Sequence, residues 1–209
     1  MQMSSTDTKN SDVLPPNFVF SADDPFYYGP ATCEFLHYKS AALTGASIEF
    51  VMQAAGTAVA FYLYNNLKSL EYFVVLFMAV FLIVSTLMTI LMAYGIFSEN
   101  AELVKPKIVI QQVQIAFLLA LAAMAIIAMC FGIETTNQIF GIFLSVPEME
   151  RDFGPIWPFN ISVLAFMTAA VGVWIHTLSC GAYDYLLDKA FFSRPNHHNI
   201  AMQSRNRDD

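Results

Sequence analysis

Charged residues are scarce in this sequence. Lys, Arg, Asp and Glu make up 13% of the 209 residues, whereas they supply about a quarter of a soluble domain. Hydrophobic residues make up 56%, and the mean hydropathy is +0.52. This balance excludes an ordinary soluble domain and predicts an integral membrane protein. The formal net charge of -7 argues against a nucleic-acid partner, because phosphate binding needs clustered Lys and Arg.

Cysteines and catalytic motifs are also scarce. The three cysteines, Cys33, Cys130 and Cys180, are too few and too widely spaced for a disulfide framework or a Cys-rich metal site. The sequence has no Gly-rich phosphate loop, no nucleophile elbow and no His-Glu-x-x-His zinc motif. We therefore expect no enzymatic activity, no metal and no cofactor.

Long apolar segments dominate what is present. The clearest covers residues 72–97, without charge or proline, and at about 1.5 Å of rise per residue it can cross a hydrocarbon core of about 30 Å. Others cover residues 41–64, 107–133 and 156–183. Short polar links predict antiparallel neighbours, hence an all-α membrane protein, an up-and-down bundle of four transmembrane helices. The tails, residues 1–40 and 184–209, are predicted to be mostly disordered.

The distribution of basic residues predicts the orientation, because cytoplasmic loops carry the excess of Lys and Arg. Only Lys68 and Arg151 fall on one side of the predicted bundle. The other side holds Lys9, Lys39, Lys105, Lys107, Lys189, Arg194, Arg205 and Arg207. Both termini are therefore expected to face the cytoplasm. Residues 134–159 would face the lumen or exterior, with the apolar stretch 139–146 along the membrane surface.

Small residues recur at steps of three and four, and such stripes mark the helix faces where backbones approach in a membrane. The fourth segment carries Ser162, Ala165, Ala169, Gly172, His176 and Ser179. The first carries Gly45, Glu49, Gln53, Gly56 and Ala60, and the third carries Gln112, Ala116, Ala120 and Ala123. These faces are expected to form the inside of the bundle.

Polar residues within the stripes fall at a similar depth and predict an intramembrane polar cluster. Its members are Glu49, Gln53, Thr89, Gln112 and His176. An unpaired carboxylate in the membrane costs about 2.5–3.5 kcal/mol on insertion scales, so Glu49 is expected to face inward and either find a partner, for which His176 and Gln112 are the candidates, or be protonated. The cluster is either a proton or substrate relay using Glu49 and His176, or a hydrogen-bonded layer that fixes helix register. We favour the layer, because no broken helix is visible.

Three further local motifs occur in the sequence. Cys33 and Cys180 flank the predicted cytoplasmic face and are candidate palmitoylation sites. Tyr183 to Leu186 has the Tyr-x-x-bulky pattern of a sorting motif, or else continues the fourth helix. The glycosylation sequon at Asn160 begins the fourth segment, too close to the membrane to be used.

Several short motifs resemble one known family. They comprise Ala93, Tyr94, Gly95, Pro106, Gln111 and Gln112, then Cys33, His37, Thr44 and Gly45, and finally Ser179, Cys180, Tyr183 and Tyr185. In this pattern the chain resembles the lysosome-associated protein transmembrane family and its nematode-type four-span relatives. The resemblance implies a protein of late endosomes and lysosomes that binds other membrane proteins or lipids and influences their traffic. The Pro-Pro-x-Tyr motifs of that family are missing from the C-terminal tail, so ligase recruitment is not carried over.

Two other classes share this topology. One is a MARVEL-type scaffold of vesicle or junction membranes. The other is a small transporter or channel subunit that uses Glu49 and His176, which is disfavoured because four spans show no internal repeat. A homo-oligomer would use a small-residue face left over after internal packing.

Overall fold

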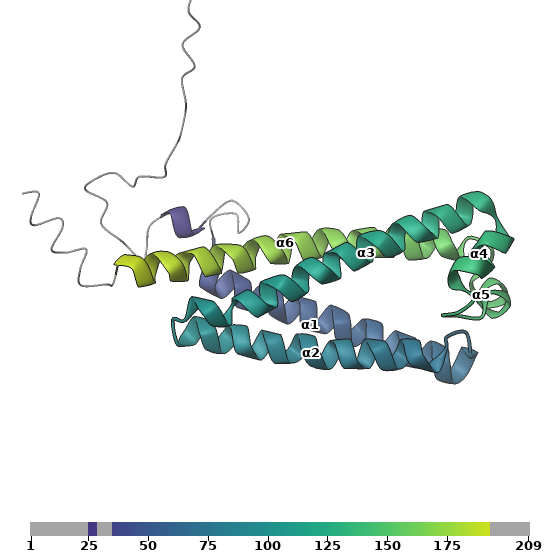
Figure 1. The fold of residues 1–209 in the computed structure, drawn as a ribbon, viewed down its shortest axis with the longest axis horizontal. Helices are drawn as coiled ribbons and strands as arrows, with labels where there is room; N and C mark the ends of the chain where they lie inside the picture. The colour runs from purple at the N-terminus through teal and green to yellow at the C-terminus, as the bar shows by residue number, and fades with distance from the viewer. Residues whose placement is uncertain (1–24, 29–34, 193–209) are drawn as a thin grey trace, which may run out of the picture.

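The structure is a computed structural model that describes residues 25–28 and 35–192. Within these residues it has four long and two short α-helices, besides three short helical turns, and no strand beyond one isolated bridge (Figure 1). The helices are α1 (Tyr38–Tyr62), α2 (Tyr72–Phe97), α3 (Lys105–Phe131), α4 (Ile133–Phe140), α5 (Val146–Phe153) and α6 (Trp157–Phe192). The four long ones are long and apolar enough to cross a membrane. The predicted fold class, an all-α four-helix membrane bundle, is confirmed.

The long helices run alternately up and down (Figure 1). One end of the bundle, here the terminal end, holds the start of α1, the end of α6 and the turn between α2 and α3; the opposite end, the cap end, holds α4 and α5. The connections between α1 and α2 and between α2 and α3 are short, so these helices are antiparallel neighbours, whereas residues 132–156, with α4 and α5, join α3 to α6. The most extensive packing is between α3 and α6, followed by α1 against α6 and α1 against α2.

Helix boundaries follow recognisable signals. Glu71 and Ser98 flank the uncharged run of α2, and Pro106 lies in the first turn of α3, where its missing N–H costs nothing. α1 ends in a single π-helical turn, η3 (Leu63–Leu67), before Lys68 takes a left-handed conformation with φ 52°. α6 continues to Phe192, so residues 184–192 are helix and the prediction of a tail from residue 184 is wrong.

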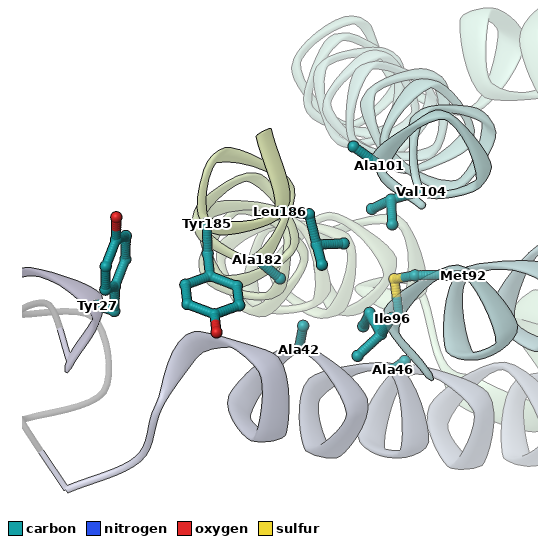
Figure 2. Packing of buried hydrophobic residues seen from close by; sticks show 10 residues of the cluster. All are labelled: Tyr27, Ala42, Ala46, Met92, Ile96, Ala101, Val104, Ala182, Tyr185 and Leu186. Carbon is teal, nitrogen blue, oxygen red and sulfur yellow. The ribbon is translucent and has the colours of Figure 1, made fainter. Parts of the chain in front are cut away.

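Small side chains and close backbone approach build the core at the terminal end. Its buried members, shown in Figure 2, are Tyr27, Ala42, Ala46, Met92, Ile96, Ala101, Val104, Ala182, Tyr185 and Leu186. They come from α1, α2 and α6, from η4 (Ala101–Leu103) with the following Val104, and from the short helix η1 (Pro25–Tyr28), and the partly buried Ile108 of α3 packs against them. A Cβ added at Gly181 would lie 2.6 Å from the Tyr38 ring, so α1 and α6 meet here only because residue 181 is glycine.

A second core closes the cap end. α4 and α5 fold back over α3 and α6 and bury Phe140, Leu144, Val146 and Met149 against Trp157. The chain breaks from α3 into α4 at Gly132, with φ 88°. Ser145 donates its backbone N–H to Ser69 O at 2.9 Å, which ties the cap to the link between α1 and α2. Within the stretch 139–146, Phe140, Leu144 and Val146 are buried, whereas Ile142 and Phe143 are exposed. That the stretch lies along the membrane surface stays a prediction.

Candidate functional site

A buried ion pair joins α1 to α3. Lys107 Nζ lies 2.9 Å from Glu49 Oε1, and the two residues are 1% and 5% exposed. Lys107 Nζ also donates to Ser85 Oγ of α2 at 3.3 Å. Three helices thus meet at one ammonium group, and the carboxylate that the membrane would otherwise penalise has a charged partner.

Glutamine side chains complete the hydrogen bonding around this pair. Gln111 Nε2 donates to Glu49 Oε2 at 2.8 Å, and Gln53 Nε2 donates to Glu49 Oε1 at 2.9 Å. Gln53 Nε2 also donates to Gln114 Oε1 at 3.0 Å. Glu49 therefore accepts from three side chains, which is the arrangement that makes a buried charge tolerable. We call Glu49, Gln53, Ser85, Lys107, Gln111 and Gln114 the ion-pair layer.

Local sequence explains how the layer is assembled. On α3, Lys107, Gln111 and Gln114 follow at steps of four and three, so they share one helix face. On α1, Glu49 follows the buried Gly45 by one turn. A Cβ at Gly45 would lie 3.2 Å from Ile175 of α6, and this close approach holds the Glu49 face inside the bundle.

The predicted partners of Glu49 are wrong. Gln112 is exposed on the outside of α3, and its neighbour Gln111 makes the bond. His176 is partly buried and contacts Cys180, with 3.6 Å between Nε2 and Sγ. Thr89 is also partly buried and donates to the backbone of its own helix, to Ser85 O at 2.9 Å. Of the predicted cluster, the structure brings only Glu49 and Gln53 together.

The small-residue stripes differ between helices. The face of α6 lies inside as expected: Ser162, Ala165, Ala169 and Ser179 are buried, and Gly172 is partly buried. The predicted stripe of α3 points outward, since Gln112, Ala116, Ala120 and Ala123 are all exposed. The packed face of α3 is instead Lys107, Gln111, Ala122, Ala125 and Ala128.

Sequence reasoning missed Lys107, which it placed at the membrane surface. A lysine in the first turn of a spanning helix normally extends to the headgroups, so burial was not the expected outcome. The available signal was the continuous face of Lys107, Gln111 and Gln114, which lies next to the predicted stripe and carries more polar atoms.

The remaining predicted motifs are placed as follows. Tyr183 and Leu186 lie within α6, and Leu186 is 0% exposed, so this segment is a continuation of the helix and its bulky residue is out of reach of a sorting adaptor. Cys180 is partly buried beside His176. Cys33 lies outside the described residues. No cluster of metal ligands occurs in residues 25–28 and 35–192.

Four apolar helices around a buried ion pair define a four-span integral membrane protein. No protein-family model matches the chain, and no solved structure matches it. Protein cuti-1 of Caenorhabditis elegans is 42% identical to it over 195 residues, which cover 93% of this chain and 96% of the relative. The chain belongs to the family of that protein.

Proposed function

We propose that this protein is a non-enzymatic four-span protein of late endosomal and lysosomal membranes, which binds other membrane proteins or lipids and influences their traffic. The observation that carries the proposal is the closed ion-pair layer. Its carboxylate, ammonium and amide groups bond to one another inside the bundle. The polar side chains thereby hold α1, α2 and α3 in register and leave the outer helix faces for contacts with neighbours.

The outer faces support this reading. Large apolar side chains are exposed along every long helix, and α2 has the least buried span of the four. In a bilayer these faces meet lipid tails or the helices of other proteins. The proposed compartment, late endosomes and lysosomes, is inferred from the resemblance to the lysosome-associated protein transmembrane family. The Lys and Arg distribution supports a terminal end that faces the cytoplasm.

The transport alternative receives less support. It required Glu49 and His176 to act together, whereas Glu49 is bonded to Lys107, Gln111 and Gln53 and His176 contacts Cys180. A MARVEL-type scaffold shares the same bundle and differs in compartment.

Location together with the effect of deletion tests the proposal. A C-terminally tagged copy is expected to coincide with a lysosomal marker, and loss of the protein is expected to change which membrane proteins reside in purified lysosomes. A tagged copy at the plasma membrane would favour the scaffold. Proton or solute flux in proteoliposomes that is abolished in a folded Glu49→Gln variant would overturn the proposal in favour of transport.

A further inference from the structure

Gln111 Oε1 is the atom of the ion-pair layer whose hydrogen bonding the structure leaves unexplained. It is buried and has no hydrogen-bond partner among the described residues, although Nε2 of the same amide is bonded to Glu49. Gln111 is 3% exposed. Leaving a buried carbonyl oxygen without a partner is costly, so such atoms are normally satisfied by protein groups or by an internal water.

A small cavity adjoins this amide. Its lining residues come from three helices: Glu49 of α1, Gln111, Gln114 and Ile115 of α3, and Gly172 of α6. Its volume is about 10 Å³. By the same measure of volume, a cavity needs roughly 10–15 Å³ to hold one water molecule. The space therefore has room for one water molecule.

We propose that the ion-pair layer binds one internal water molecule at this position. The water donates one hydrogen bond to Gln111 Oε1 and the second to the carboxylate of Glu49, and it accepts from the amide of Gln114. Two to four polar partners are what an internal water requires. A monovalent cation fits less well, because Lys107 already balances the charge of Glu49.

Gly172 keeps the space open. A Cβ added there would lie 3.2 Å from Ile115 Cγ1, on the wall of the cavity. Gly172→Ala is therefore expected to exclude the water without touching the polar groups. Gly56→Ala is the matched control, since a Cβ at Gly56 would meet only Met78 Cε, at the ordinary distance of 3.7 Å. The proposal concerns the interior of the bundle and stands independently of the compartment and partners proposed above.

Solid-state NMR of the full chain in lipid bilayers tests the site. With glutamine side chains labelled by ¹⁵N, and Gln111 assigned through the peak lost in Gln111→Met, magnetisation is expected to pass from water to Gln111 Nε2. This transfer is expected to persist in Gly56→Ala and to be lost in Gly172→Ala. Because Lys107 is retained in both variants, relay through its exchangeable protons cannot produce that difference.

Two results would overturn the water site: no transfer to Gln111 in the wild type, or equal transfer in a folded Gly172→Ala protein. If Gly172→Ala does not fold, a high-resolution map of the wild type decides. Density about 2.7–3.2 Å from Gln111 Oε1, the hydrogen-bond range, supports the proposal, and continuous apolar packing there refutes it.

Discussion

Lys107 of α3 reaches Glu49 of α1 inside the bundle, and the side chain of this lysine is 0% exposed. A lysine this close to a helix start could reach the headgroups, yet here it turns inward and also meets Ser85 of α2. Desolvating two charges is costly, and the cost is offset only when geometry and further hydrogen bonds are good. The glutamines at 2.8 and 2.9 Å from the carboxylate provide those bonds.

Breaking this pair on one side is expected to destabilise the protein strongly. Lys107→Met and Glu49→Gln should each lower the free energy of unfolding by about 3–5 kcal/mol, because each leaves the other buried group without its partner. The double variant should lose less than the sum of the two. Unfolding in mixed detergent micelles measures all three. Lys105→Met is the control, since the Lys105–Glu102 pair is exposed and contributes little to stability; strictly additive losses would contradict the pairing.

Gly181 is expected to be intolerant of even one methyl group. Gly181→Ala places a Cβ at 2.6 Å from the Tyr38 ring, and such overpacking costs about 1–3 kcal/mol. Gly56→Ala has room and should be neutral or stabilising by up to about 1 kcal/mol, since alanine favours helix. Thermal unfolding in detergent compares them. Equal melting temperatures would show that α1 and α6 do not approach so closely.

The terminal end carries an acid-sensitive link between Glu99 and Lys189. The hydrogen bond from Lys189 holds the pKa of the Glu99 carboxyl below its usual range. Because the folded pKa is the lower one, this stabilisation is present at neutral pH and is lost as the pH falls through the depressed value. Both side chains are partly exposed, so its size is about 0–1 kcal/mol. Melting temperatures of wild type and Glu99→Gln should differ at neutral pH and converge in acid; a constant difference would exclude the link.

The segment from Tyr183 to Leu186 is expected to act in packing. Leu186→Ala should cost about 2–5 kcal/mol because its side chain is 0% exposed in the core of the terminal end. Tyr183→Ala should leave the steady-state location of a tagged protein unchanged. Redistribution of folded Tyr183→Ala protein to the cell surface would instead support the interpretation of this segment as a sorting motif.

Orientation can be tested on two exposed turns. In a cysteine-free background, Ser98→Cys at the terminal end and Asn66→Cys near the cap end should react with an impermeant maleimide from opposite sides of sealed vesicles. Ser98→Cys is expected to react from the cytoplasmic side. The reverse pattern would invert the proposed topology, and labelling of both from one side would contradict the bundle.

Sequence patterns predicted most of the architecture because bilayer thickness and the cost of burying charge leave few choices. The segment 72–97 coincides with α2, where an uncharged run lies between Glu71 and Ser98. Register was harder to predict. On α3, Gln111 and Gln112 each begin a stripe with alanines, and the two stripes differ by one residue, or about 100° of rotation. Composition alone could not show that Lys107 selects the Gln111 face.

The C-terminal boundary failed for a related reason. Asp184, Asp188 and Lys189 resemble a solvated tail by charge. Between them, Tyr185 packs edge-on against the rings of Tyr27 and His37, and Leu186 is buried in the core of the terminal end. The helix therefore continues through both residues. Contacts between segments that are distant in the sequence determine where α6 ends, and these contacts cannot be read from a single sequence.

The length of α6 has a mechanical consequence. Its 36 residues extend about 54 Å at 1.5 Å per residue, and even with a tilt of about 20° it outreaches a hydrocarbon core of about 30 Å by some 20 Å. The remaining length forms a rigid helical extension outside the hydrocarbon core. Tyr27 supports this extension, because its hydroxyl donates a hydrogen bond to Asp188 at 3.1 Å. Phe192, the last residue of α6, therefore ends well outside the hydrocarbon core on a rigid support.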